Sequence, residues 1–270
     1  MGEPPGPVGT YLATVRMWGR SAMQYRASLI LLMVNGTLIA GLELVALLVV
    51  FGNVRSLGGF TLSEALYLYG AAQAAFYISD LMFTGTEYLG DRIRMGTFDA
   101  LLVRPVGVLP QVFADQFTPR RFCPLIPAGG ALVAGLVGAP IHWTWLRAAL
   151  VPYTLLTGVA VFGAIWVFVG AFQIMVTDAS EAMNVVTYGG QFMSSYPLAL
   201  YGRNLMLFLT FGVPFAFVNW QPTLYLLGHA DPLGLPSALR FAGPLFAAAL
   251  WCLALVAWRA ALRHHRSTGS

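Results

Sequence analysis

The sequence of 270 residues has very few charged residues. They make up 10% of it, whereas hydrophobic residues make up 58%. Soluble domains carry roughly 25% charged residues, so a chain this poor in charge is typical of an integral membrane protein. Lysine is absent, and all 15 basic residues are arginine. The net charge of +4 is small, and the charged residues are segregated by the side of the membrane expected for each loop. This distribution indicates membrane topology and argues against nucleic acid as a partner.

Motifs of common enzymes are also missing. Without lysine there is no Gly-x4-Gly-Lys-Ser/Thr phosphate loop, and neither His-Glu-x-x-His nor Gly-x-Ser-x-Gly occurs. The two cysteines, Cys123 and Cys252, lie far apart in or beside apolar runs. This spacing predicts buried small side chains and no disulfide or metal site. We therefore expect no catalytic, metal-binding or cofactor-binding residues in this chain.

Long apolar runs predict an all-α transmembrane bundle, because a spanning helix needs about 20 apolar residues. Residues 28–262 hold the expected bundle, between an N-terminal cytoplasmic segment, 1–27, and a cytoplasmic tail, 263–270. The stretch Ala182–Leu200 is apolar but interrupted by glycine, serine and proline. We expect it to form a helix at the cytoplasmic membrane surface. Six runs have the length of a span: Ser28–Phe51, Thr61–Phe83, Phe122–Ala139, Leu146–Val176, Asn204–Trp220 and Leu239–Ala261.

Arginines divide unequally between the two sides that six spans would create. Three of them, Arg55, Arg147 and Arg240, fall on one side. Cytoplasmic loops are enriched in arginine, so both termini and the loop 87–121 should be cytoplasmic. Twelve fall on the other side: Arg16, Arg20, Arg26, Arg92, Arg94, Arg104, Arg120, Arg121, Arg203, Arg259, Arg263 and Arg266.

Two prolines and one loop complete the expected architecture. Pro214 and Pro244 fall within the fifth and sixth runs and predict a kink in each. The largest external segment is Gln221–Ala238, where Leu224–Leu227 predicts a short helix lying at the outer surface.

Three polar residues at membrane depth, Asn35, Glu43 and Asp80, are candidates for a translocation path. A carboxylate in hydrocarbon costs roughly 2.5–3.5 kcal/mol on insertion scales, so it must face protein or water. Two interpretations stay open for Glu43 and Asp80. Either they line a path or couple to protons, or they are solvated at the interface or paired between helices. Asn35 is explained more simply by a hydrogen bond between helices.

A short block between the second and third runs, Glu87–Pro105, is first charged and then apolar. Its apolar part, Phe98–Val103, contains a single carboxylate, Asp99. Pro105 disfavours a helical conformation at Arg104 and so limits the segment. An amphipathic helix here can insert apolar side chains into a groove on a partner. The alternative is an interfacial helix that touches only lipid.

The end of this block resembles a known family. Gly96–Pro105 reads Gly-Thr-Phe-Asp-Ala-Leu-Leu-Val-Arg-Pro, similar to the Gly-x-Leu/Phe-Asp-x-Leu-Leu-x-Arg-Pro signature of ABC-2 type exporter permeases. Its nearest branch is the small six-span permeases encoded with a separate ATPase. The segments Tyr196–Tyr201 and Phe211–Val218, the latter followed by Pro222, resemble two further motifs of this family. The resemblance extends from about Ser28 to Arg259.

The resemblance implies a coupling region that docks on a nucleotide-binding subunit. It also implies an amphipathic helix near Tyr11–Arg26 that lies along the membrane. ATP and Mg²⁺ would then bind two copies of the partner ATPase, beside a second permease chain that is identical or paralogous. The candidate coupling residues are Asp91, Arg92, Arg94, Gly96, Phe98, Asp99, Leu101, Leu102, Arg104 and Pro105.

The preferred hypothesis is thus a subunit of an ATP-driven exporter in a bacterial cytoplasmic membrane, moving a hydrophobic or amphipathic substrate. The alternative is an ion-coupled secondary transporter or channel that uses Glu43 and Asp80. Such proteins usually contain internal repeats, and the sequence has no clear inverted repeat. An intramembrane enzyme is the weakest hypothesis, because no nucleophile or metal-ligand set is present.

Overall fold

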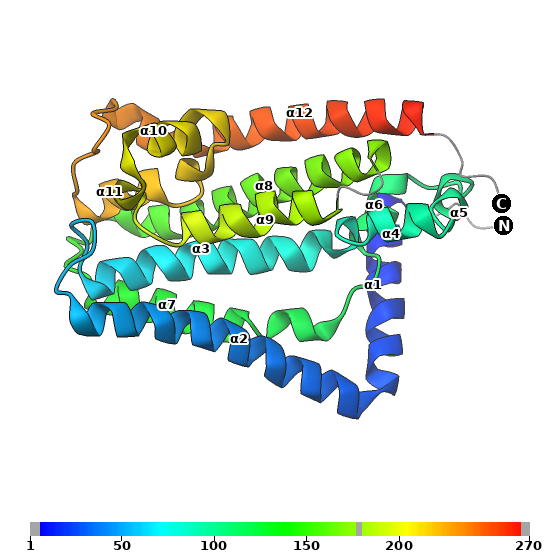
Figure 1. Ribbon diagram of the computed structural model, residues 1–270, viewed down its shortest axis with the longest axis horizontal. Helices are drawn as coiled ribbons and strands as arrows, with labels where there is room; N and C mark the ends of the chain where they lie inside the picture. The colour runs from blue at the N-terminus through cyan, green and yellow to red at the C-terminus, as the bar shows by residue number, and fades with distance from the viewer. Residues whose placement is uncertain (1–5, 177–179, 266–270) are drawn as a thin grey trace.

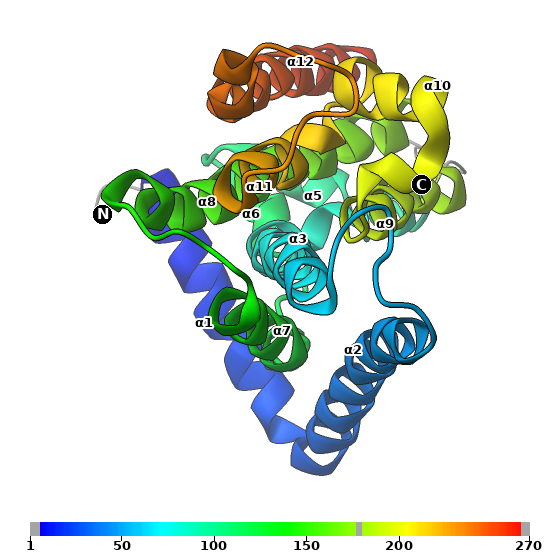
Figure 2. The same ribbon diagram turned by 90° about the vertical axis from the view of Figure 1, so that its left-hand side faces the viewer.

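The computed structural model describes residues 6–176 and 180–265, and all named elements within these ranges are helices. The longer ones lie side by side along the length of the molecule, as Figure 1 shows. α3 lies in the middle of this bundle, between α7 and α8 (Figure 2). These helices are α2 (Arg26–Asn53), α3 (Leu62–Phe83), α7 (Leu125–Gly138), α8 (Trp145–Met175), α9 (Ser180–Ser194) and α12 (Gly243–His264).

Four segments of the described chain are long and apolar enough to cross a membrane: Arg26–Asn53, Pro119–Gly138, Trp145–Met175 and Gly243–His264. Together with the helical fold they indicate a multi-pass membrane protein. α3 does not belong to this set, although its 22 residues would extend roughly 33 Å at 1.5 Å per residue. The expected number of six spans stays a prediction.

Glycines allow α3 and α7 to approach closely. A Cβ added at Gly70 of α3 would lie 2.3 Å from the backbone nitrogen of Leu132. A Cβ added at Gly135 of α7 would lie 2.2 Å from the backbone nitrogen of Tyr67. Each helix therefore offers a glycine where the backbone of the other passes, which is the usual way for membrane helices to pack tightly.

α9 is not the surface helix that the sequence predicted over Ala182–Leu200. It lies beside α3 and α8 (Figure 1). The Tyr188 ring contacts Phe76 of α3, with ring centroids 5.6 Å apart, and Trp166 of α8, with centroids 6.3 Å apart. The prediction of a helix at the cytoplasmic membrane surface is therefore wrong.

The small residues of α9 explain the error. Thr187, Gly190, Gln191 and Ser194 lie on its buried face. A Cβ at Gly190 would come within 2.0 Å of the Phe215 ring. Glycine and serine indicated an interrupted surface segment, but here they make close helix packing possible.

The predicted fifth span, Asn204–Trp220, is not one helix. The chain forms α10 (Gly202–Leu207), a π-helical turn (Phe208–Gly212) and a 3₁₀ turn (Phe215–Phe217), followed by α11 (Trp220–Leu227). These short elements lie together at the end of the bundle opposite α1 (Figure 1). We call this end the α11 end.

Proline chemistry explains this difference. Pro214 has no N–H to continue the helical hydrogen bonds, so it ends the π-helical segment where a kink was predicted. α11 is the short helix predicted near Leu224–Leu227, and its residues Gln221, Thr223 and Leu224 are buried in the protein. Its position at the outer membrane surface stays a prediction. Pro244 lies in the first turn of α12, where a missing N–H has no cost, so the kink predicted there is wrong as well.

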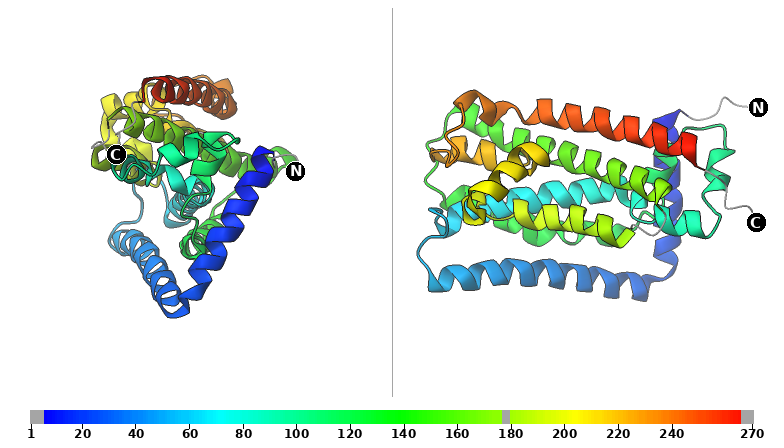
Figure 3. Two further views of the ribbon diagram at one scale, coloured as in Figure 1. Left: turned by 90° about the vertical axis from the view of Figure 1, so that its right-hand side faces the viewer. Right: turned by 45° about the horizontal axis from the view of Figure 1, so that its top comes forward.

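The other end, called here the α1 end, gathers the remaining short helices. α1 (Pro7–Gln24) runs across the ends of the long helices (Figure 3). The last turn of α12 is at the same end (Figure 1). So are three short helices between α3 and α7: α4 (Leu89–Arg94), α5 (Asp99–Leu102) and α6 (Val108–Phe113).

Candidate functional site

Polar side chains form a strip along α3 and α9. On α3 they are Gln73, Tyr77 and Asp80, spaced i, i+4 and i+7, which places them on one helical face. On α9 they are Tyr188 and Gln191, spaced i and i+3. Glu43 of α2 joins them through a hydrogen bond. We call these six residues the polar strip.

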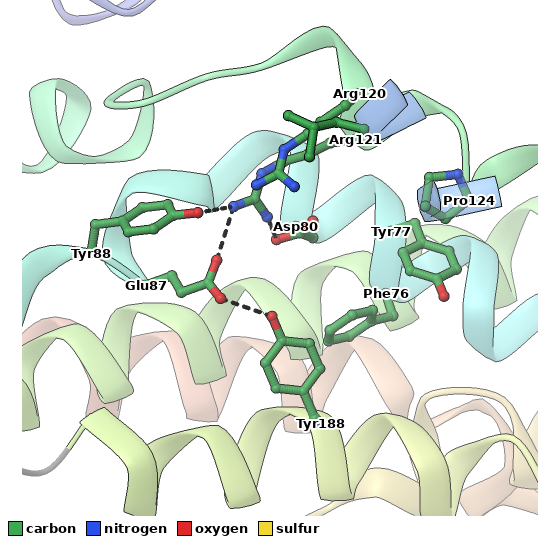
Figure 4. A pocket seen from close by; sticks show the side chains of 11 residues that line it. Phe76, Tyr77, Asp80, Glu87, Tyr88, Arg120, Arg121, Pro124 and Tyr188 are labelled. Atoms are coloured by element: carbon green, nitrogen blue, oxygen red, sulfur yellow. Dashed lines mark hydrogen bonds and ion pairs between the residues drawn. The ribbon is translucent and has the colours of Figure 1, made fainter. Parts of the chain in front are cut away.

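Near the α1 end the strip borders a cleft of about 310 Å³, called here the inner cleft (Figure 4). It is lined by α2, α3 and α9, by Glu87 and Tyr88 just before α4, and by the 3₁₀ turn Pro119–Phe122. Four of its lining residues are aromatic: Phe76, Tyr77, Tyr88 and Tyr188.

Arg121 is the centre of the hydrogen-bond network in this cleft (Figure 4). Its guanidinium forms an ion pair with Asp80 of α3 and lies 2.9 Å from the Glu87 carboxylate. It also donates to the Tyr88 hydroxyl at 3.2 Å. The Tyr188 hydroxyl of α9 donates to the other Glu87 oxygen at 2.9 Å. One buried arginine therefore joins α3, α9 and the segment that leads into α4.

Arg121 and the two carboxylates of the inner cleft are paired as burial requires. The side chain of Arg121 is 9% exposed and that of Asp80 is 11% exposed. A buried charge without an opposite charge is strongly destabilising, whereas a guanidinium can serve two carboxylates at once. Of the two interpretations left open for Asp80, pairing inside the protein is the one observed. Its participation in a translocation path stays a prediction.

At mid-span the strip continues as a chain of amides. The Gln191 side-chain amide donates to the Gln73 carbonyl oxygen, and the Gln73 amide donates to the Glu43 carboxylate at 2.9 Å. Gln73 and Gln191 are buried, and Glu43 is exposed in this single chain. Three helices are thus joined by two hydrogen bonds.

The structure brings Glu43 and Asp80 onto one strip but leaves Asn35 outside it. Asn35 is exposed on α2. It lies eight residues before Glu43, which corresponds to a rotation of about 80° around a helix with 3.6 residues per turn. The three candidates therefore do not share one face, and a translocation path through any of them stays a prediction. Sequence reasoning missed Gln73 and Gln191, although the polar spacing on α3 could have indicated the first.

The coupling residues predicted from the sequence divide into a buried group and an exposed group. Phe98 and Leu101 are 1% and 5% exposed, and they belong to a core that includes Ile174 of α8 and Trp258 of α12. The prediction that these two side chains insert into a partner is wrong. Exposed apolar side chains are present instead at Met95, Leu102 and Val103.

Charged members of the block hold its shape. Arg92 forms a salt bridge with Asp115, which follows α6, with its Nη2 atom 2.6 Å from the carboxylate. Arg94 and Asp91 form an exposed ion pair within α4. Asp99 begins α5 and contacts the His265 ring.

Three remaining residues define the bends of the block. Gly96 has a φ of +67°, which glycine adopts without strain and which separates α4 from α5. Arg104 and Pro105 are exposed in the turn after α5. The Arg104 guanidinium donates a hydrogen bond to the Gln111 side chain of α6 at 3.4 Å.

A family model described as ABC-2 family transporter protein matches residues 37–269. The chain belongs to this family. The match covers the polar strip and the whole of Glu87–Pro105, called here the coupling block, and it confirms the resemblance carried by Gly96–Pro105. Searches of curated proteins and of solved structures give no match.

Membership of the ABC-2 family identifies the chain as a membrane transporter component. Such a component is generally not catalytic itself and works with an ATP-binding partner. The apolar helices agree with this assignment.

Proposed function

We propose that this ABC-2 protein is the transmembrane subunit of an ATP-driven exporter whose ATP is hydrolysed on a separate nucleotide-binding subunit. The observation that carries this proposal is an apolar surface on the coupling block. Met95, Leu102 and Val103 are 66%, 39% and 83% exposed, beside Arg94 and Arg104. We call these five residues the docking patch. Exposed apolar side chains and arginines on one short block suit a groove with acidic edges on a soluble partner.

The block beneath the patch is built to transmit movement. Phe98 and Leu101 anchor it in the core shared with α8 and α12. Glu87 and Arg121 connect it to Asp80 of α3. A displacement of the patch by closure of the partner would therefore move three long helices, because packed interfaces shift as units. In this mechanism ATP closure changes the opening between α2, α3 and α9, where the polar strip lies.

The same proposal fixes an orientation. The α1 end would face the cytoplasm of a bacterial cell, with both termini on that side of the cytoplasmic membrane. Val8, Leu12 and Met23 are exposed on α1, and this helix would lie amphipathically along the membrane surface. Two ATPase copies and a second permease chain, identical or paralogous, would complete the transporter, with ATP and Mg²⁺ bound to the ATPase alone.

A second candidate function is supported by Glu43. A carboxylate at membrane depth, linked by amides across three helices, would also suit an ion-coupled transporter or channel. Asp80 supports this alternative less well, because Arg121 is its partner. Proton-driven flux through the purified chain without any ATPase would favour it.

The decisive experiment is purification of the full chain in mild detergent, with each accompanying protein identified and its ATPase activity measured. We expect an ATPase to co-purify and to be stimulated by the permease. Val103→Asp should abolish the stimulation and leave the yield of folded protein unchanged, because this side chain is exposed. The matched control is Val54→Asp in the exposed loop after α2, which should retain it. Full stimulation with Val103→Asp contradicts the docking assignment.

A further inference from the structure

A second cleft lies at the corner where α1 meets α2 (Figure 1), and we call it the elbow cleft. Residues from the end of α1, from the first two turns of α2 and from the segment before α7 line it. Its volume is about 220 Å³, whereas sites for drug-sized ligands have volumes of roughly 300–1,000 Å³. The elbow cleft is therefore suited to a small chemical group and not to a large cargo.

Among the described residues, Arg120 is the one charged residue that lines this cleft. It is half-buried and also borders the inner cleft, beside Arg121 (Figure 4). Arg121 is held by Asp80 and Glu87, whereas no carboxylate of the described chain forms a salt bridge with Arg120. Its Nε atom donates a long hydrogen bond of 3.4 Å to the nearby Thr118 hydroxyl. The Arg120 guanidinium therefore has its charge and most of its donors available for a ligand.

The two helices of the elbow contain no acidic residue over a long stretch. Residues 7–42 include three arginines but no aspartate or glutamate. These arginines, Arg16, Arg20 and Arg26, are all exposed. The two carboxylates of the adjoining inner cleft are paired with Arg121, so the elbow as a whole is positively charged. This charge favours an anionic ligand.

The elbow cleft also lies at the depth of lipid headgroups. α2 is long and apolar enough to cross a membrane, so its first turn, at Arg26, lies at one membrane surface. Trp18 and Tyr25 line the cleft from the side of α1, and tryptophan and tyrosine are enriched at the boundary between membrane and water. A cleft at this depth is reached by the headgroups of neighbouring lipids.

The lining changes from polar to apolar along α2, as a lipid does from headgroup to chain. Ser21 and Ser28 are exposed, and their hydroxyls can donate to phosphate oxygens. Leu29 and Leu32 lie about one and two turns into α2 and offer apolar surface to an acyl chain. An inorganic anion would make no use of these leucines. A zwitterionic headgroup would find no carboxylate in the described lining for its cationic group.

We propose that the elbow cleft binds the phosphate group of an anionic phospholipid. Arg120 supplies the charge, Ser21 and Ser28 donate hydrogen bonds, and Leu29 and Leu32 contact the start of an acyl chain. Basic pockets at a membrane surface hold phosphate headgroups by the same chemistry. The lipid connects α1, α2 and the segment before α7, and so holds α1 in place at the membrane. This site requires that α2 spans the membrane and does not rest on the exporter function proposed above.

The test uses the full chain in mild detergent, with native mass spectrometry to count and titrate bound lipids. The probe is dioleoyl phosphatidylglycerol, and the comparison is dioleoyl phosphatidylcholine, because the two share acyl chains and differ in headgroup charge. We expect one phosphatidylglycerol to bind about tenfold more tightly than phosphatidylcholine. Inorganic phosphate and dioleoylglycerol, which offer only the phosphate or only the chains, should not displace it.

Variants of Arg120 test its role as the cation. Arg120→Gln should weaken phosphatidylglycerol binding about tenfold, because it removes a hydrogen bond between charged groups, and should leave phosphatidylcholine binding unchanged. Arg120→Lys keeps the charge and should bind phosphatidylglycerol within about threefold of the wild type. Arg263→Gln is the matched control. It removes the same charge from an exposed position in the last turn of α12, at the α1 end, and should bind as the wild type does.

Variants of Ser28 test the cleft without changing Arg120. Ser28→Trp places a large ring in the cleft from an exposed position and should abolish the preference for phosphatidylglycerol. Ser28→Ala should weaken the binding only about threefold, because one neutral hydrogen bond is lost. Size-exclusion profiles show which variants are folded, so a loss of structure is not mistaken for a loss of binding.

Four results would overturn the proposal. They are equal binding of the two lipids, displacement of phosphatidylglycerol by inorganic phosphate, unchanged binding in Arg120→Gln or Ser28→Trp, and an equal loss in Arg120→Gln and Arg263→Gln.

Discussion

The Nε2 atom of His265, directly after α12, lies 3.0 Å from an Asp99 oxygen in α5, although the two residues are 166 positions apart. The His265 ring also meets the edge of Phe98, with ring centroids 5.1 Å apart. The end of the last long helix is thus attached directly to the coupling block. Movement of that block has a direct route into α12 as well as into α3.

The contact between His265 and Asp99 should contribute modestly to stability. Asp99 is 38% exposed, and exposed ion pairs are worth about 0.2–1 kcal/mol. A double-mutant cycle with His265→Ala and Asp99→Asn, read by thermal unfolding in detergent, should give a coupling energy in that range. His264→Ala is the control, because this neighbouring ring is exposed and contacts only its own helix. Strict additivity of the first two changes would show that the contact is absent in solution.

Replacing Phe98 should lower the stability of the chain, whereas replacing Leu102 should lower ATPase stimulation, although both residues were predicted to contact a partner. Phe98→Ala removes a buried aromatic side chain and should cost about 3–5 kcal/mol. Leu102→Ala should change the stability by less than about 0.5 kcal/mol, because surface substitutions rarely do more. Unfolding of the purified chain measures both. ATPase stimulation, measured at a temperature where both variants are folded, should fall for Leu102→Ala. An equal loss of stability in the two variants would contradict the assignment of Phe98 to the core.

The bounds of the long helices α8 and α2 are predicted well from the sequence. An apolar run can be recognised without knowing how the rest of the chain folds. The run Leu146–Val176 corresponds to α8 within one residue at each end, and Ser28–Phe51 differs from α2 by two residues at each end. The family motif at Gly96–Pro105 was also readable, since its signal is local. Which of its side chains face a partner was not readable, because burial of Phe98 depends on α8 and α12.

The inner cleft shows why the site itself was only partly predictable. Asp80 was recognised from its membrane depth. Its partner Arg121, however, lies 41 residues further along the chain, in the 3₁₀ turn Pro119–Phe122. Arg121 was counted with other arginines as a sign of the cytoplasmic side, and its charge alone does not indicate burial. Tyr188 lies on α9, which was expected on the membrane surface. Contacts made by folding a distant segment back onto a helix leave no periodic signal in the sequence.

Arg121→Ala should be among the most destabilising single substitutions in the chain. It removes the guanidinium that Asp80 and Glu87 share, and breaking a buried pair costs about 3–5 kcal/mol. The stability of Arg121→Lys should lie between that of the wild type and that of Arg121→Ala. A lysine ammonium cannot reproduce the planar guanidinium geometry that holds two carboxylates. Size-exclusion profiles after heating in detergent give the order of stability.

The control for this series is Arg94→Ala in the exposed pair with Asp91, where the two side chains are 48% and 50% exposed. It should change the stability by less than about 1 kcal/mol. If Arg121→Ala were as stable as Arg94→Ala, the ion pairs of the inner cleft would have no structural role.

Two glycines of α7 should respond to alanine in opposite directions. At Gly135 a Cβ would lie 2.2 Å from the backbone nitrogen of Tyr67, so Gly135→Ala must push α7 away from α3. Overpacking of this kind costs about 1–3 kcal/mol, and more where backbone atoms cannot yield. At Gly129 nothing lies within 4 Å of the added Cβ, so Gly129→Ala should stabilise the helix by about 0.4–1 kcal/mol. Thermal unfolding of the two variants in the same detergent tests the pair. Equal unfolding temperatures would contradict the close contact of α3 with α7, because helix propensity alone predicts the same gain at both positions.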